Sequence, residues 1–296
     1  MRYLSVALAC ALAACASGGG NGPPPPPPPP KILLGAHIPW SQNAMTPVTA
    51  FETSLGRKLD IVKFYPSWPP WSAWDVSFAK AIVAHGAVPY LVIGQRIGQN
   101  GCVKFADVVN GVYQTQLATT ASQIADIAKT STGDATVRVE ILPEMTQPDM
   151  LCANPTMDPS LYIKVYNIVA GVIRATQAPD VRLEWSPGQP AFDANVEMKW
   201  YPSDAYVDDV GEHEYNSTTT PKIFHAAVCA VAASLGKPAV IGETGAIGEA
   251  AQLDWLAGSP CSPLAGEIYF DEEAVAPYNY VISTPDVFAA FAKLGN

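Results

Sequence analysis

Val137-Arg-Val-Glu-Ile-Leu-Pro-Glu144 and Lys237-Pro-Ala-Val-Ile-Gly-Glu243 are the two stretches that decide the fold of this chain. Each is a short apolar run, rich in β-branched residues, that ends on a glutamate. Such runs are typical of strands buried on both faces of a parallel sheet. A carboxylate at the end of a buried strand is costly unless it is paired or used. The two stretches therefore predict two acids that face one cleft, although they lie far apart in sequence.

Strand-like and helix-like runs alternate along the chain. The predicted strands are Ile32–Ile38, Asp60–Tyr65, Val88–Ile93, Thr136–Leu142, Arg182–Trp185, Asp208–Glu214, Ala239–Gly242 and Gly266–Phe270. The predicted helices are Val48–Leu55, Trp74–His85, Tyr113–Thr130, Pro159–Ala175, Pro221–Leu235, Ala250–Ala257 and Pro285–Leu294. Glycines follow several of these helices and favour their termination: Gly86, Gly133, Gly236 and Gly295. Repeated strand–helix units predict the α/β class, and eight strands predict a single-domain (β/α)8 TIM barrel. An open doubly wound sheet is the alternative, but the first strand lacks a GxGxxG turn.

Composition excludes several classes of function. The chain has 296 residues, of which 49% are hydrophobic and 15% charged, and its formal net charge is −10. An acidic chain does not suit nucleic acid, whose phosphates demand basic patches, but it is compatible with a neutral polysaccharide. No GxSxG, P-loop or HExxH motif occurs, so serine hydrolase, nucleotide and zinc-protease chemistry lack support. We expect a monomer without cofactor or metal.

The N-terminus has the pattern of an export signal. Residues 1–14 combine a positive start with a short apolar run, and Leu12-Ala-Ala-Cys15 resembles a bacterial lipobox in which Cys15 carries the lipid. An ordinary secretory signal cut nearby is the alternative. Residues 15–30 form a Gly/Pro-rich linker ending in eight prolines, and residues 31–296 form the barrel domain. We expect a lipoprotein of the outer membrane or cell surface, attached to the membrane only through its lipid.

Four cysteines remain in the predicted domain, an even number in a chain expected to be exported. Their spacing does not suggest a metal site. Three pairings are possible, and we expect Cys102 with Cys152 and Cys229 with Cys261.

Side-chain alternation predicts which residues face the cleft. In a TIM barrel the active site lies at the carboxyl ends of the strands. Because side chains alternate along a strand, one face should carry Glu140, Leu142 and Glu144, another Gly211, His213 and Tyr215, and a third Ile241 and Glu243.

A family resemblance follows from three segments. Trp200-Tyr-Pro-Ser-Asp-Ala-Tyr-Val-Asp-Asp-Val-Gly211 with Tyr215-Asn216 resembles a stretch of glycoside hydrolase family 26, and Leu183–Pro187 and Lys237–Gly245 resemble its flanking strands. That family contains β-mannanases and relatives acting on β-1,3-xylan or mixed-linkage β-glucan. The resemblance implies that Glu243 is the nucleophile, Glu144 the acid/base and Tyr215 the residue that positions the nucleophile. The chain departs from the family pattern at Glu140, Pro143, Thr146 and His213, where the family has arginine, histidine, asparagine and an acidic residue.

Retaining glycoside hydrolysis needs two carboxyl groups about 5–5.5 Å apart. Glu243 would attack the anomeric carbon while Glu144 protonates the departing oxygen. Glu140 is a candidate for a functional role in substrate binding, and a structural ion pair with Arg138, His213 or Lys63 is an equally good interpretation. His37 and His213 are predicted substrate contacts, with ordinary hydrogen-bonded barrel histidines as the alternative.

Aromatic residues near the strand ends predict sugar-binding subsites, because indole and phenyl rings stack on the apolar faces of sugars. The candidates are Trp40, Trp68, Trp71, Trp74, Trp185, Tyr269 and Phe270. Loop packing is the alternative for each. Together these features predict a lipid-anchored glycoside hydrolase that cleaves a β-linked polysaccharide with retention. A surface glycan-binding lipoprotein with a degenerate barrel and no turnover is the alternative function.

Overall fold

The computed structural model describes residues 31–39, 45–66, 68–97, 101–131, 137–187, 198–215, 221–256, 261–262, 264–271, 281–282 and 284–294. Residues 31–296 form one compact unit. Within the described segments, no helix has the length and apolar character needed to cross a bilayer. The predicted lipidation site, Cys15, and the linker fall outside the described residues.

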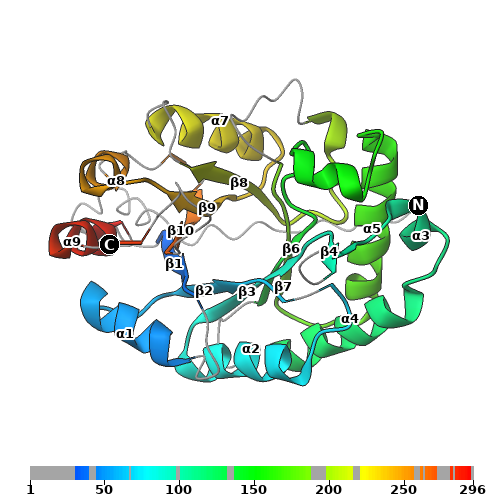
Figure 1. The fold of residues 1–296 in the computed structure, drawn as a ribbon, viewed down its shortest axis with the longest axis horizontal. Coiled ribbons are helices and arrows are strands. Elements are labelled where there is room, and N and C mark those ends of the chain that lie inside the picture. The colour runs from blue at the N-terminus through cyan, green and yellow to red at the C-terminus, as the bar shows by residue number, and fades with distance from the viewer. Residues whose placement is uncertain are drawn as a thin grey trace, which may run out of the picture. The chain divides into compact units, whose positions relative to one another are not determined.

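Eight parallel strands close into a barrel, as the sequence predicts (Figure 1). The strands of the barrel are β1 (Leu33–His37), β2 (Ile61–Phe64), β3 (Val88–Ile93), β6 (Val137–Ile141), β7 (Val181–Trp185), β8 (Asp209–Tyr215), β9 (Ala239–Gly245) and β10 (Leu264–Phe270). Their order around the barrel follows the chain, and β1 pairs with both β2 and β10 to close the ring.

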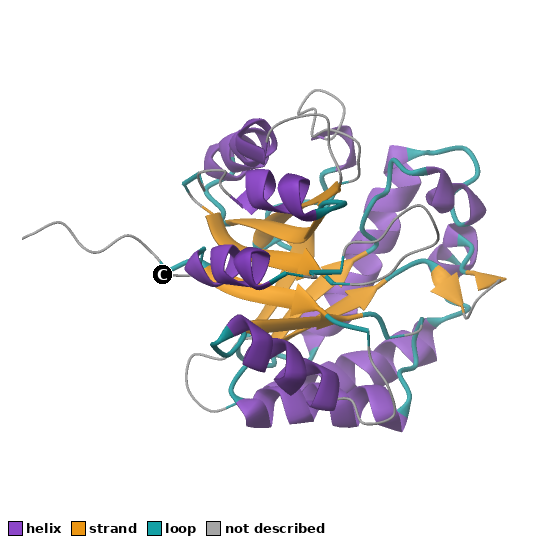
Figure 2. Cartoon of the chain, turned by 60° about the vertical axis from the view of Figure 1, so that its left-hand side comes forward, coloured by secondary structure: helices purple, strands orange, loops and turns teal. Residues whose placement is uncertain are grey.

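Helices cover the outside of the barrel, and the strands run through its middle (Figure 2). The helices among the described residues are α1 (Met45–Leu55), α2 (Ala73–His85), α3 (Phe105–Val109), α4 (Gln114–Ala128), α5 (Pro159–Ala175), α7 (Pro221–Ser234), α8 (Glu249–Leu256) and α9 (Pro285–Lys293). Every predicted helix is present within a few residues of its predicted bounds. The helix α2 begins with a capping box between Ser72 and Asp75 and ends at Gly86, whose φ of 93° is the left-handed conformation that terminates helices. Gly133 and Gly295 fall outside the described residues.

The barrel separates two apolar clusters. The small cluster lies inside the barrel and consists of Ile61, Val88, Tyr90, Val240 and Ile268. A much larger cluster lies between the outer faces of the strands and the helices. Buried charged and polar side chains occupy another part of the interior, and the candidate site lies there: Lys63, Glu140, Glu184, His213 and Glu243.

The loops contain elements that periodicity did not predict. A two-stranded hairpin, β4 (Arg96–Ile97) with β5 (Gly101–Cys102), follows β3, and the 3-10 helices η1 (Pro148–Cys152) and η2 (Met198–Trp200) follow β6 and β7. Strands of two residues are too short to show an alternating pattern.

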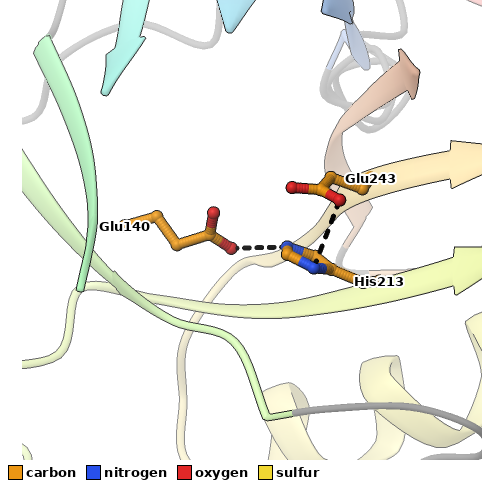
Figure 3. A group of neighbouring side chains, drawn as sticks. All are labelled: Glu140, His213 and Glu243. Carbon is orange, nitrogen blue, oxygen red and sulfur yellow. Dashed lines mark hydrogen bonds and ion pairs between the residues drawn. The ribbon is translucent and has the colours of Figure 1, made fainter. Parts of the chain in front are cut away.

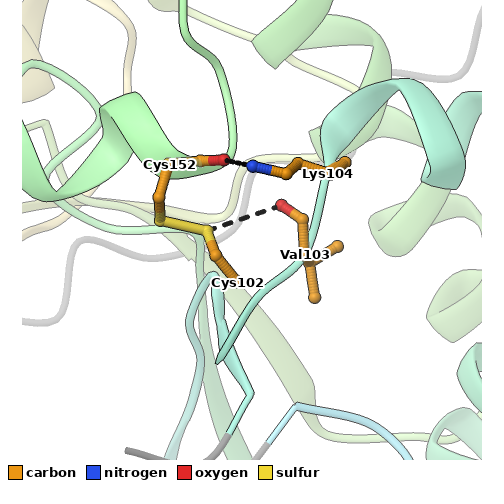
Figure 4. The surroundings of a disulfide bond; sticks show 4 residues. All are labelled: Cys102, Val103, Lys104 and Cys152. Atoms are coloured by element: carbon orange, nitrogen blue, oxygen red, sulfur yellow. Dashed lines mark hydrogen bonds between the residues drawn. A yellow bond between two sulfur atoms is a disulfide. The ribbon is translucent and has the colours of Figure 1, made fainter. Parts of the chain in front are cut away.

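Both predicted disulfides are present. Cys102–Cys152 joins the hairpin to η1, and Lys104 donates to the carbonyl oxygen of Cys152 beside it (Figure 4). Cys229–Cys261 joins α7 to the segment that precedes β10.

Candidate functional site

Glu243 reaches the barrel interior through an irregularity in β9. Glu212 on β8 pairs with Ile241, but the next residue, His213, pairs with Glu243, so Gly242 is an extra residue in β9. This bulge reverses the alternation: Ile241 packs in the outer core, whereas Glu243 points into the barrel. The prediction that Ile241 and Glu243 share a face is therefore wrong, and Glu243 faces the barrel interior because of the bulge.

Glu144 is placed by a strained turn and not by alternation. Strand β6 ends at Ile141, and the backbone then adopts positive φ at Leu142 (48°) and again at Glu144 (57°). Left-handed backbone at such residues is uncommon and costs about 1–3 kcal/mol each. The amide of Glu144 donates to the carbonyl oxygen of Ser186 at 3.0 Å, which holds the turn against the end of β7. Leu142 is buried in the outer core, so it does not share a face with Glu140 as predicted.

The imidazole of His213 joins the two candidate catalytic acids. Its Nδ1 lies 3.0 Å from Oε1 of Glu144 and 3.5 Å from Oε2 of Glu243. These two oxygens are therefore at most about 6.5 Å apart, which is the lower edge of the spacing in inverting glycosidases and is compatible with the shorter spacing in retaining ones. Closure of the barrel thus brings together the ends of β6 and β9.

Glu243 also belongs to a buried network of ion pairs inside the barrel. Nζ of Lys63 lies 2.7 Å from Oε2 of Glu140 and 2.8 Å from Oε1 of Glu243, and it donates to the carbonyl oxygen of Gly242 at 3.0 Å. Nε2 of His213 lies 2.7 Å from the other oxygen of Glu140. Of the three partners predicted for Glu140, the structure selects Lys63 and His213, while Arg138 pairs with Asp209.

Figure 3 shows two glutamates and the histidine of this network, Glu140, Glu243 and His213, with their side chains pointing toward one another. Their ligand-type atoms all lie within 4.8 Å of one another, which is close enough for a metal site. However, the Lys63 ammonium already contacts both carboxylates and balances part of their negative charge. We do not assign a metal to it.

The network fixes the charges of its members. Burial alone would raise the pKa of Glu243, but His213 and Lys63 outweigh it and hold that pKa below its usual value. Burial alone would lower the pKa of His213, yet Glu243 and Glu140 raise it well above the ordinary value. Glu243 is therefore a carboxylate and His213 an imidazolium at neutral pH.

Two tyrosines hold the carboxylate of Glu243. Tyr65, just after β2, donates to Oε1, and Tyr215 at the end of β8 donates to Oε2. Burial, and then the charge of Glu243, raises the pKa of both phenols well above the usual value, so both remain donors. The contact of Tyr215 with Glu243 is the one that the sequence predicted.

An aromatic group surrounds this carboxylate at the end of the barrel. His37 stacks on Phe270 with 4.7 Å between ring centroids, and Tyr65 and Tyr215 contact these rings edge-on. His37 is only 2% exposed, and its Nδ1 lies 3.1 Å from the carbonyl oxygen of Lys63, so the structure favours an ordinary hydrogen-bonded barrel histidine over the predicted substrate contact.

Glu184, on β7, is a second buried acid that sequence analysis did not single out. It accepts hydrogen bonds from Tyr90 and, at 2.9 Å, from Ser186. Burial, and then the charge of Glu140, raises its pKa to about 7. A Cβ atom at Gly211 would lie 2.2 Å from Oε1 of Glu184, so a larger residue there would have to displace this carboxyl group.

Several predicted sugar-binding aromatics do not lie at the cleft. Trp68 and Trp71 are only 5% and 4% exposed and belong to the outer core, because the apolar loop after β2 folds against the helices. Trp185 is fully buried against Tyr201. Tyr269 points outward from β10 and packs on Phe291 of α9, so its predicted place in the substrate site is wrong, and Phe270 takes the inner face.

Two further tryptophans were predicted near the strand ends. Trp74 packs against Phe78 within α2, and Trp40 lies outside the described residues.

Sequence analysis named Lys63 only as a possible partner of Glu140, missed its contact with Glu243, and did not name Tyr65 as a site residue. Both face the interior from β2, and the signal was present, since a lysine within a fully buried apolar strand needs a carboxylate partner. Their importance depends on Glu140 and Glu243, which come from distant strands, and no local pattern identifies that pairing.

Comparisons with known proteins bear on the fold of this chain. No family model matches the chain, and no curated protein matches it in sequence. Solved structures do match. A β-mannanase from a symbiotic protist of the termite Reticulitermes speratus, complexed with gluco-manno-oligosaccharide, has 15% identity and a TM-score of 0.66, covering 88% of this chain and 86% of its own.

Two bacterial structures are equally similar. The glycoside hydrolase family 26 β-mannanase of Bacteroides ovatus has 16% identity and a TM-score of 0.66, covering 89% of this chain and 87% of its own. The catalytic domain of the endo-β-1,4-mannanase of a Bacillus species has 17% identity and a TM-score of 0.66, with 89% and 86% covered. At these identities the likeness establishes the fold: a single-domain (β/α)8 barrel like those of family 26 β-mannanases.

Proposed function

We propose that this protein is a retaining glycoside hydrolase in which Glu243 is the nucleophile and Glu144 the acid/base. The observation that carries the proposal is the convergence of both carboxylates on one atom, Nδ1 of His213, at 3.0 and 3.5 Å. Glu144 is 34% exposed whereas Glu243 is 8% exposed. One acid thus faces solvent and the departing group, while the other lies deeper, where it can reach the anomeric carbon.

Glu243 is prepared to attack as an anion. Lys63 and His213 keep it ionised, and the hydroxyl groups of Tyr65 and Tyr215 fix the orientation of its plane. Each carboxylate oxygen has two lone pairs, so Oε2 can accept from Tyr215 and still attack carbon. Glu144 then gives a proton to the leaving oxygen, and later takes one from the water that hydrolyses the glycosyl ester.

The substrate class follows from the surroundings of the two acids. Phe270, Tyr65 and Tyr215 are partly exposed and offer ring surfaces near Glu243, which suit the apolar faces of an uncharged sugar. The similar solved structures are β-mannanases, one of them complexed with gluco-manno-oligosaccharide. We therefore place β-mannan first among β-linked polysaccharides, followed by β-xylan and mixed-linkage β-glucan.

The test uses the purified protein on these three polysaccharides. The wild type should release reducing ends from at least one of them, and Glu243→Ala should be at least about 1,000-fold slower. Proton NMR in the first minutes should show the β-anomer of the product before mutarotation, because two displacements retain configuration. Early appearance of the α-anomer would contradict the mechanism.

A matched control separates chemistry from general damage. Glu249 is an exposed glutamate in the first turn of α8, and Glu249→Ala should leave the rate unchanged. If wild type and Glu243→Ala both bind a polysaccharide and neither cleaves it, the glycan-binding alternative replaces the hydrolase.

We also propose that Cys15 is lipidated and attaches the barrel to the outer membrane or cell surface. The support is the signal-like residues 1–14 and the proline-rich linker that follows. Labelled palmitate should enter the wild type but not Cys15→Ala, and a soluble, unlabelled wild type would contradict the proposal.

A further inference from the structure

His213 is too enclosed to contact substrate, and its contact with the proposed acid/base suggests more than a structural role. The side chain is 1% exposed, so it is enclosed by protein and cannot stack on a sugar. Both of its ring nitrogens are committed to carboxylates: Nε2 to Glu140 at 2.7 Å and Nδ1 to Glu144 at 3.0 Å. Its ring therefore connects the acidic network inside the barrel to the acid at the cleft.

The protons of this contact can be counted. Burial raises the pKa of Glu140, but Lys63 and His213 lower it well below the usual range, so Glu140 is an anion and Nε2 of His213 donates to it. Nδ1 then has two arrangements with Glu144. Either Nδ1 carries a proton and donates to the Glu144 carboxylate, or Glu144 carries that proton and donates to Nδ1. In both arrangements, one proton is shared between Nδ1 of His213 and the carboxyl group of Glu144.

We propose that His213 shares the catalytic proton with Glu144, so that the pair, and not Glu144 alone, is the acid/base of the reaction. This inference rests on the proposed function above. It assigns His213 as a residue that acts through Glu144, in place of the substrate contact expected from the sequence.

The proton movements balance in both half-reactions. As Glu243 attacks, the proton of Nδ1 passes to Glu144, which transfers it to the leaving oxygen as the glycosidic bond breaks. His213 is then neutral, Glu144 is a carboxylate and Glu243 is an ester. In the second half-reaction, water attacks the ester and gives its proton through Glu144 back to Nδ1, and Glu243 leaves as a carboxylate.

Charge conservation supports this coupling. Glu243 lies 3.5 Å from Nδ1, and its negative charge favours the imidazolium. When Glu243 becomes an uncharged ester, the imidazolium loses that support at the stage when its proton has been transferred. The loss of a negative charge at Glu243 thus matches the loss of a positive charge at His213, and the buried network keeps its net charge.

The groups that surround His213 raise or lower its pKa. Among the described residues they include Lys63 from β2, Glu140 from β6 and Glu144 after it, and Glu243 from β9. The neutral phenols of Tyr65 and Tyr215 act on His213 through their hydrogen bonds to Glu243. Lys63 opposes the imidazolium from 3.4 Å, whereas the three glutamates favour it.

The kinetic test compares leaving groups. An oligosaccharide needs protonation of its departing oxygen, whereas 2,4-dinitrophenolate leaves without a proton. With mannotetraose, His213→Gln should lose at least about 100-fold in kcat/KM, the lower end of what general acid catalysis contributes. With 2,4-dinitrophenyl β-mannobioside the loss should stay within about 5-fold, and the pH profile with mannotetraose should lose its alkaline limb.

Equal losses on the two substrates would show a structural role only and would overturn the proposal. The matched control is His85→Gln. His85 also pairs with a glutamate, Glu52 at 2.8 Å, but lies on α2 and should leave both rates and the pH profile unchanged.

A second measurement does not depend on activity. The chain has only 4 histidines, so the ring nitrogens of histidine-labelled protein can be assigned by single substitutions. Glu144→Gln should lower the titration midpoint of His213 by at least about 1 pH unit, and the control Glu249→Gln should not change it. A midpoint unaffected by Glu144→Gln would overturn the shared proton. If the wild type cleaves no glycan, the proposed function fails, while this titration still decides whether the proton is shared.

Discussion

Replacing Lys63 by methionine tests the electrostatic account of the barrel interior most directly. The ammonium group is fully buried and contacts two carboxylates, Glu140 at 2.7 Å and Glu243 at 2.8 Å. Methionine has nearly the same length and no charge, so Lys63→Met removes the cation while leaving little empty volume. The two carboxylates keep only His213 as a neighbouring cation among the described groups.

The magnitude follows from the burial of the network. Removing one partner of a buried ion pair destabilises a protein by about 3–5 kcal/mol, because the remaining charge is left uncompensated. Each kcal/mol corresponds to roughly 2–4 °C in Tm for a domain approaching this size, so Tm should fall by roughly 6–20 °C. Burial lowers the pKa of Lys63, but Glu140 and Glu243 raise it above its usual value, so the ammonium is charged at every ordinary pH and the loss should not depend on pH around neutrality.

Urea unfolding and calorimetry of three variants provide the assay. Lys63→Met should show the full loss, and Lys63→Met with Glu140→Gln should recover at least about 1 kcal/mol of it, because the second change removes one uncompensated carboxylate. The matched control is Lys129→Met, since Lys129 pairs with Asp126 on the surface at 3.2 Å and should change stability by no more than about 1 kcal/mol. A loss below about 1 kcal/mol for Lys63→Met, or no recovery in the double variant, would refute the reasoning.

Three further outcomes are expected. Tyr215→Phe removes the donor to Oε2 of Glu243, and kcat/KM should fall about 10- to 100-fold with little change in Tm, as expected for a hydrogen bond to a charged group; an unchanged rate would contradict the positioning role. Burial, and then two neighbouring glutamates, raises the pKa of Glu214 to about 10. The folded state therefore keeps this proton while the unfolded state loses it near pH 4.5, so stability is lost as pH rises between these values, by up to about 1.4 kcal/mol per pH unit. Urea unfolding at pH 5 and pH 8 should show a smaller decrease for Glu214→Gln than for the wild type, and parallel decreases would contradict this. Replacing Cys229 and Cys261 by serine opens a loop of 32 residues and should cost about 3–4 kcal/mol by calorimetry; a Tm unchanged from the wild type would contradict a stabilising role for that bridge.

The arrangement of strands and helices could be predicted from the sequence because it depends on local patterns. Val88–Ile93 shows no interruption of its apolar run, and its predicted bounds are those of β3. Pro159–Ala175 begins after the capping Asp158, with proline in its first turn, and its predicted bounds are those of α5. The alternation along β8 also holds, since Gly211, His213 and Tyr215 all face the interior.

The same local reasoning failed where alternation stops. It oriented Glu144 and Glu243 by alternation, whereas the position of Glu144 depends on left-handed backbone at Leu142 and Glu144, and that of Glu243 on the extra residue Gly242. A period-two pattern carries no signal for either irregularity. Aromatic loop residues failed similarly, because Trp68 and Trp71 look alike in sequence whether they face a sugar or a helix.

By itself, the sequence determined a barrel of alternating strands and helices, the residues of both disulfides, and two glutamates at strand ends. Only the tertiary structure decided that Lys63 neutralises Glu140 and Glu243, and that His213 contacts both Glu144 and Glu243. The physical reason is the range of the forces involved. Periodicity and chain termination act between neighbours in sequence, whereas the charges of a buried network come from strands that meet only when the barrel closes.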